Sequence, residues 1–152
     1  MSSDDNSNSS AALSKALSGD VNAQVELAKS LETEGQADVA LGWYKKAAIQ
    51  GHSEAAILAG LLCLKSDSSV QRDAFFWFQK AATQGSAEGE YQLALLYESG
   101  MGVKMDPDES LRWLRIAANH GHAKAIAKLD NLRLFLDSVS PDNNLPRKNW
   151  TA

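Results

Sequence analysis

The chain has 152 residues, 44% of them hydrophobic, and its 15 Lys and Arg against 19 Asp and Glu give a formal net charge of -4. The length and the apolar content predict one domain with its own core. The acidic balance and the scattered basic residues argue against a nucleic-acid partner. No apolar run approaches the roughly 20 residues of a membrane-spanning helix, so we expect no membrane insertion.

The two ends of the chain are polar. We expect a disordered N-terminal tail at residues 1–9, a helical repeat domain at residues 10–137 and a C-terminal tail at residues 138–152. The N-terminal tail contains no apolar stretch and is not a signal peptide as written. The single cysteine, Cys63, excludes an internal disulfide. These features predict a cytoplasmic protein; a periplasmic or secreted one would require that a native leader has been removed.

Apolar residues recur at spacings of three and four along the chain, which predicts helices. In chain order, the predicted helices span residues 10–18, 21–34, 37–50, 53–65, 71–84, 87–99, 107–120 and 123–137. Pro107 follows Asp106 and precedes two acidic residues, which suits the first turn of a helix.

Three segments, residues 41–51, 75–85 and 111–121, end in nearly the same way, with a tryptophan, an Ala-Ala pair and a closing glycine. All three features are spaced by 34 and then 36 residues, and one period shared by three residue types indicates an internal repeat. Gly19 would close a truncated leading unit. Each unit is predicted to be a pair of helices that can bury its apolar face only by stacking on its neighbours.

The closing glycines are expected one position past the second helix of each unit, where a left-handed conformation is needed. They are Gly51, Gly85 and Gly121. The Ala-Ala pairs allow close approach of the neighbouring helix, while the tryptophans fill wider gaps between units. The predicted fold is all-α, a right-handed α-solenoid of about three helix-pair repeats with N- and C-terminal capping helices.

The third unit carries a Gly100-Met101-Gly102-Val103 turn, followed by Leu111-Arg112-Trp113 and Ala117-Ala118. It resembles the Sel-1-like repeat, a relative of the tetratricopeptide repeat, and the resemblance covers about residues 15 to 130. The first two units depart from the pattern, because they lose this turn and shorten the loop to residues 34–36 and 67–69. The resemblance implies adaptor or scaffold work.

Tetratricopeptide domains, which this fold resembles, bind partners on the concave side through positions equivalent to 88, 91, 95 and 98. Carried through the repeat, this implies that partner binding involves Val25, Lys29, Glu54, Ile57, Leu61, Leu64, Glu88, Tyr91, Leu95 and Glu98. The apolar centre edged by glutamates suits an amphipathic helix or an extended peptide with basic residues beside apolar anchors. The same residues are equally consistent with plain core or with a dimer contact.

The expected function is therefore non-catalytic binding of a protein or peptide of unknown identity. The alternative is a self-assembling structural protein, a homodimer for example, in which the apolar residues and the terminal helix at 123–137 form the interface. Trp150 stands alone in a polar tail. It either packs on the last helix as a cap or anchors a partner.

Residue types that could carry chemistry have simpler explanations. His52, His120 and His122 fall in the turns between units and are expected to bond to helix C-terminal carbonyls, and no cysteine or carboxylate cluster completes a metal shell. The Gly100 turn lacks the third glycine and the preceding strand of a phosphate loop. Cys63 falls on a buried helix side, where an inert thiol is expected. We expect no enzyme, no cofactor and no metal.

Overall fold

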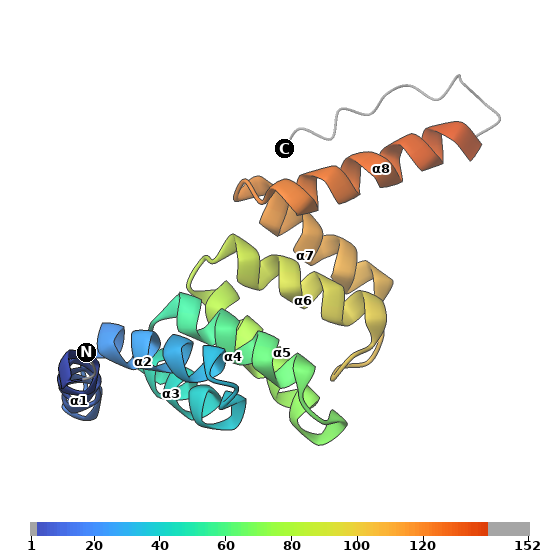
Figure 1. Ribbon diagram of the computed structural model, residues 1–152. Coiled ribbons are helices and arrows are strands. Elements are labelled where there is room, and N and C mark those ends of the chain that lie inside the picture. Colours follow the sequence, from blue (N-terminus) through green and yellow to red (C-terminus); the bar gives the residue numbers. More distant parts are fainter. Residues whose placement is uncertain (1–2, 140–152) are drawn as a thin grey trace.

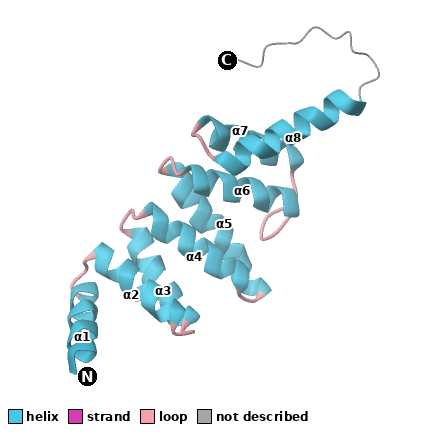
Figure 2. Ribbon diagram, turned by 45° about the horizontal axis from the view of Figure 1, so that its top comes forward, coloured by secondary structure: helices cyan, strands magenta, loops and turns pink. Residues whose placement is uncertain are grey.

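The computed structural model describes residues 3–139, with side chains from residue 10 onward. Within this part the chain is entirely helical (Figures 1 and 2). The helices are α1 (Ser3–Leu17), α2 (Val21–Thr33), α3 (Ala37–Ile49), α4 (Ser53–Lys65), α5 (Ser68–Thr83), α6 (Ala87–Ser99), α7 (Pro107–Asn119) and α8 (Ala123–Val139). The pairs α2–α3, α4–α5 and α6–α7 stack in chain order between α1 and α8. The predicted α-solenoid with capping helices is confirmed.

Helix boundaries differ from the sequence prediction mainly at the starts of two helices. The sequence places the fifth helix from residue 71, but α5 begins at Ser68 after the N-cap residue Asp67. It also predicts a disordered tail at residues 1–9, but α1 begins at Ser3. Polar residues lower helix propensity by less than about 1 kcal/mol each, so they can extend a helix that is nucleated further along. The predicted C-terminal tail lies outside the described residues beyond Val139.

The turns between successive repeats share one closing geometry. At the last of them, the Gly121 N–H donates to the Ala118 carbonyl and the His122 N–H donates to the Ala117 carbonyl, both at 2.9 Å. This is a Schellman closure, which needs a left-handed residue after the helix. The predicted glycines supply it with φ of 96°, 77° and 83° at Gly51, Gly85 and Gly121. In all three turns, both accepting carbonyls belong to the Ala-Ala pair.

Small residues set the distance between helices in the middle of the stack. A Cβ added at Gly89 of α6 would lie 2.8 Å from the Ala81 Cβ and from the Ala82 nitrogen of α5. A Cβ added at Gly60 of α4 would lie 2.5 Å from the Phe78 ring. The predicted role of the Ala-Ala pair, close approach of the next helix, is therefore confirmed at the α5–α6 contact.

The buried residues form two clusters of unequal size. The main cluster draws on every helix from α2 to α6. The second joins α6, α7 and α8 and has four buried members, Ala94, Leu114, Ala117 and Ala125. Trp113 packs against both clusters. None of the described helices is long and apolar enough to cross a membrane.

The turn between α6 and α7 is the one predicted at residues 100–103. Its Gly102 has φ of 73° and lies against α5, where an added Cβ would be 2.9 Å from the Gln71 carbonyl oxygen. The Asp106 carboxylate then accepts hydrogen bonds from the first N–H groups of α7, and Pro107 opens that helix, as predicted. A glycine-rich turn is thus used for backbone packing in the stack.

Candidate partner-binding face

The ten residues that the sequence assigns to partner binding lie on the first helices of the three pairs, α2, α4 and α6. Nine of them are at least partly exposed. Val25 is the exception, because it is only 3% exposed and belongs to the main cluster. Its side chain is shorter than those of Ile57 and Tyr91 at the equivalent positions, so it ends inside the packed layer. The assignment of Val25 to a binding surface is corrected accordingly.

The apolar members on α4 and α6 form what we call the apolar strip: Ile57, Leu61, Leu64, Tyr91 and Leu95. Each is partly exposed. The three from α4 pack against the main cluster, and Tyr91 packs against the second. These four side chains therefore have an inner side against the core and an outer side at the surface, and Leu95 is partly exposed beside them. Binding of a partner on this surface stays a prediction.

The charged members of the set are already paired, either between α2 and α4 or from α6 to α8 and the residue before it. The Lys29 ammonium lies 3.2 Å from the Glu54 carboxylate, and the hydrogen bond with Glu54 raises the pKa of Lys29. The Glu98 carboxylate lies 2.6 Å from the ammonium of Lys128 on α8. The Glu88 carboxylate lies 2.8 Å from Nε2 of His122. These glutamates, expected to meet basic residues of a partner, each face a side chain of the chain itself.

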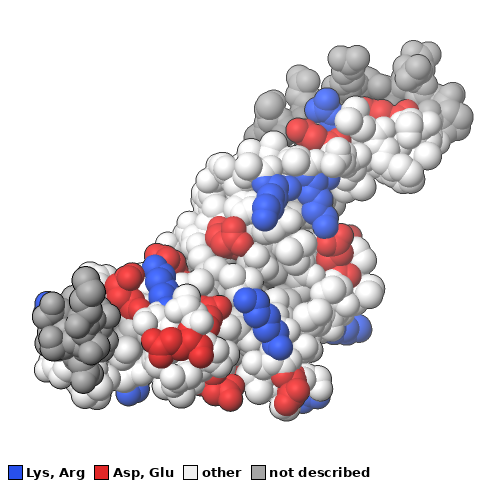
Figure 3. Space-filling view, viewed as in Figure 1, with Lys and Arg blue, Asp and Glu red and all other residues white. Residues whose placement is uncertain are grey.

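The ionic contacts divide the face into three parts. Two ion pairs join α2 to α4, and two contacts join α6 to α8. No ion pair joins α4 to α6 in the part of the chain that the structure describes, and the apolar strip occupies this junction. Figure 3 shows groups of neighbouring acidic and basic side chains on one face of the molecule, with uncharged surface between the groups.

Four residues that take part in these contacts, Glu32, Lys65, His122 and Lys128, were not assigned to this face from the sequence. The Lys65 ammonium lies 3.7 Å from the Glu32 carboxylate. Lys128 pairs with Glu98, and His122 pairs with Glu88. The signal that could have found them is opposite polarity about one repeat apart, because the two members of each of these pairs lie 30 to 34 positions apart. The repeat brings such positions onto adjacent helices.

The histidines do not bond as the sequence suggests. Nδ1 of His52 accepts the Ala55 N–H at 3.1 Å, and Nδ1 of His122 accepts the Ala125 N–H at 3.3 Å. Both therefore cap the start of the following helix, because the residue after the glycine turn is already its N-cap. His122 also stacks on Tyr91, with ring centroids 4.4 Å apart. No group of three or more potential metal ligands occurs in the described residues.

Two titratable groups are buried in the main cluster. Cys63 is fully buried, as predicted, and burial raises the pKa of its thiol. Tyr44 is also fully buried, and its hydroxyl donates a hydrogen bond to the Glu32 carboxylate at 3.2 Å. Burial, followed by the Glu32 charge, raises the pKa of Tyr44. Both groups are held in their neutral forms, which suits packing.

The family model of the Sel1 repeat matches residues 22–52, 53–86 and 87–122. The chain is similar to a protective antigen of uropathogenic Escherichia coli that displays an SLR fold, with TM-score 0.74 and 28% identity over 86% of this chain and 29% of that chain. It is also similar to a Sel1 repeat protein from Oxalobacter formigenes, with TM-score 0.65 and 32% identity over 79% of this chain and 95% of that one. The chain thus spans less than a third of the first protein. No curated protein matches it significantly.

Proposed function

Because the chain belongs to the Sel1 repeat family, whose repeats typically mediate protein interactions, we propose that it is a non-catalytic scaffold that binds a protein or peptide on its apolar strip. The observation that carries this proposal is the position of the strip. It is partly exposed, and it occupies the junction between first helices that no ion pair crosses in the described residues. The proposal assigns no chemical step to the chain.

The dimensions of the strip suit a short helical or extended partner. Ile57, Leu61 and Leu64 lie one turn apart along α4, so they cover about 10 Å at a rise of ~1.5 Å per residue. Tyr91 and Leu95 add a parallel row on α6. A partner helix with apolar side chains every three or four residues would place about two turns on this surface. Tyr91 is the aromatic anchor on the side of the scaffold.

The ionic contacts on both sides of the strip bear on the chemistry of the partner. Glu54, Glu88 and Glu98 are already paired with Lys29, His122 and Lys128. A basic partner would have to displace those contacts, so electrostatic attraction contributes little net free energy. We expect the affinity to depend weakly on salt, because burial of apolar surface supplies most of it.

The proposal is tested with peptides selected from a displayed random library on the wild-type protein. Their affinity is then measured for Leu61→Glu/Leu95→Glu and for a control, Val39→Glu/Ile49→Glu, whose side chains on α3 are 50% and 67% exposed. The strip variant is expected to lose at least about tenfold in affinity, as hot-spot losses do, while the control retains it. Full affinity in a strip variant of normal helical content would overturn the assignment.

A second candidate function is self-assembly through the strip and the terminal helix. The observation that favours it is the exposed apolar surface of α8, where Leu134 and Phe135 are each 61% exposed. Surface of this kind often marks a contact. Sedimentation over a wide range of protein concentration decides, because a dimer must appear as the concentration rises. A monomer at every concentration would exclude this candidate.

We also propose that the protein acts in the cytoplasm. Its support is Cys63, which is unpaired and fully buried, since proteins without disulfides suit reducing compartments. Fractionation of the source cells should recover the chain with cytoplasmic markers. Recovery with periplasmic or secreted proteins would contradict this assignment and leave the binding proposal untouched.

A further inference from the structure

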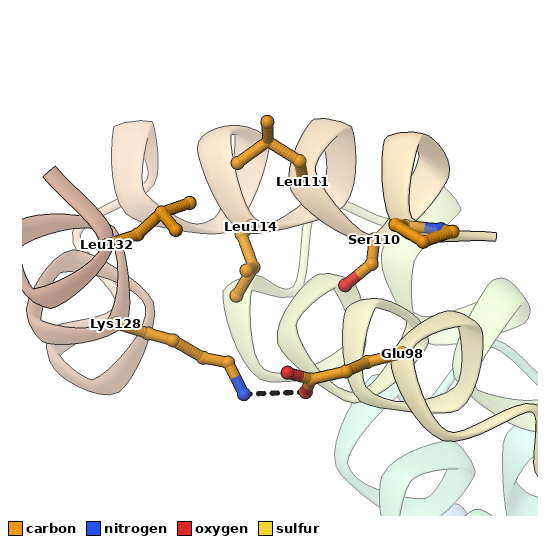
Figure 4. Close-up of a pocket in the computed structure, with 7 residues that line it drawn as sticks. Glu98, Ser110, Leu111, Leu114, Lys128 and Leu132 are labelled. Atoms are coloured by element: carbon orange, nitrogen blue, oxygen red, sulfur yellow. Dashed lines mark hydrogen bonds and ion pairs between the residues drawn. The ribbon is translucent and has the colours of Figure 1, made fainter. Parts of the chain in front are cut away.

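A small pocket lies where α8 crosses α6 and α7. Leu114 of α7 and Leu132 of α8 face each other across it, and the Glu98–Lys128 ion pair closes one side (Figure 4). Its volume is about 210 Å³, below the roughly 300–1,000 Å³ of small-molecule sites. The pocket is mainly apolar and matches one large side chain better than a cofactor.

The apolar surface continues from this pocket along α8. This helix has 17 residues, whereas α6 and α7 have 13 each, so its last turns extend beyond the helices that support it (Figure 1). Phe135, Leu136 and Val139 are between 55% and 61% exposed there. With Leu132, 42% exposed, they form a continuous apolar stretch leading away from the pocket.

A helix that packs on α8 as α5 packs on α4 does not suit the apolar surface of α8. Asp130 of α8 is exposed and stands at the repeat position of Gly60 in α4 and Ala94 in α6, both of which are buried. In the second unit, this position meets Phe78 of the following helix. A helix packed on α8 in the same manner would bury the Asp130 carboxylate, which is costly without a partner. The occupant must therefore approach α8 differently from α5 or α7.

We propose that the C-terminal segment, residues 140–152, folds back along α8 and seats the Trp150 side chain in this pocket. The segment contains one aromatic residue, Trp150, and its two prolines disfavour a regular helix. Trp150 follows Val139 by 11 residues, an extended reach of about 36 Å. The helix rises only about 10 Å from Leu132 to Val139. The chain is long enough to turn at the Pro-Asp-Asn-Asn sequence and return.

The charges agree with this occupant. Arg147 and Lys148 lie three and two residues before Trp150, respectively. With the indole in the pocket, they fall near the Glu98 carboxylate at its edge, whose side chain is 49% exposed. Because Glu98 already pairs with Lys128, a basic residue there adds little net free energy, and the apolar contact supplies most of the stabilisation. Leu145 and Pro146, further back in the segment, would cover Leu136 of α8.

The test uses the full chain labelled with 5-fluorotryptophan, whose four fluorine resonances are assigned by single Trp→Phe variants. A soluble paramagnetic agent broadens each resonance according to its exposure. Trp150 is expected to be protected like Trp77, which is 6% exposed, and to be broadened less than the half-buried Trp43 and Trp113. Leu132→Asp should remove this protection, and the control Leu134→Asp, on the opposite side of α8, should leave it intact.

Three outcomes would overturn the proposal. The first is a Trp150 resonance broadened more than those of Trp43 and Trp113 in the wild type. The second is protection that survives Leu132→Asp, which would place Trp150 elsewhere. The third is protection that disappears on dilution, because the pocket would then be filled by a second copy of the chain. Circular dichroism of both α8 variants verifies that the stack remains folded, so a loss of protection can be assigned to the pocket.

Discussion

The middle of the stack and its C-terminal end are held together by different forces. Between α4 and α5, Gly60 lets the Phe78 ring approach so closely that an added Cβ would lie 2.5 Å from it. At the equivalent of Ala56 in α4, α6 carries Glu90, and both residues are buried. Nδ1 of His120 lies 2.8 and 2.9 Å from the two Glu90 oxygens. One repeat position is thus filled by packing in one unit and by a polar contact in the next, which predicts different responses to mutation.

The largest loss of stability is expected from adding a side chain at Gly60, where α4 meets the Phe78 ring of α5. Gly60→Ala should lower the free energy of unfolding by about 2–3 kcal/mol, because overpacking forces a buried side chain or the backbone to shift. The Phe78 ring that it meets is fully buried and has no open side to move into. Urea denaturation followed by circular dichroism measures the change.

Gly42→Ala is the matched control, since Gly42 also lies inside a helix but an added Cβ there meets nothing within 4 Å. This variant should be stabilised by about 0.5–1 kcal/mol, the usual preference for Ala over Gly in a helix. Equal effects at the two glycines would show that backbone freedom, not the ring contact, decides the outcome.

A smaller effect is expected at the polar contact of the C-terminal end. His120→Ala should lower the free energy of unfolding by about 1–2 kcal/mol, because it removes a hydrogen-bond partner from the buried Glu90 carboxylate. Glu90→Ala/His120→Ala should cost less than His120→Ala alone, since alanine already fills this position in α4. Urea denaturation of the two single variants and the double variant gives the coupling. Additive losses would mean that the contact contributes nothing to folding.

The smallest effect is a change in acid sensitivity at Glu88. Burial alone would raise its pKa, but hydrogen bonds from Gln92 and His122, with the charges of His122 and Lys124, lower it below the ordinary 4.5. A lowered carboxyl pKa stabilises the fold above the unfolded-state value, and this contribution is lost as the pH falls through the folded-state value. Stability should therefore decline below about pH 4.5, and less steeply in Glu88→Gln.

Hydrogen exchange of the α8 amides at a series of acidic pH values locates this effect. The wild type should lose protection in α8 before it does in α4 or α5, because Glu88 holds the α7–α8 turn through His122. A decline that Glu88→Gln leaves unchanged would assign the acid sensitivity to other carboxylates.

The helices and turns were predictable because each repeat carries residues that mark where its helices begin and end. The closing glycines, such as Gly121, fix where a second helix ends, and their recurrence fixes the number of units. Pro107 marks the start of α7 in the same way. Local signals of this kind depend on only a few neighbouring residues, so one sequence was enough to identify them.

The candidate site was less predictable because its properties depend on neighbouring helices. The repeat register placed Val25 beside Ile57 and Tyr91, but only packing shows that Val25 is buried. The same register marked Glu98 as free for a partner, whereas its contact with Lys128 requires α8 in place. The Gly60 contact with Phe78 was also invisible, because a glycine inside a helix gives no sign of what approaches it.

Extensive helix–helix contacts in this chain connect helices that are consecutive in the sequence, from α1–α2 to α7–α8. On a translating ribosome, each newly released helix therefore meets a partner that has already emerged. The α4–α5 hairpin is complete in the nascent chain before α7 has been synthesised. Contacts between consecutive helices favour rapid folding. The nascent protein can therefore fold from its N-terminal end onward, and its main core can be buried before synthesis of the chain is complete.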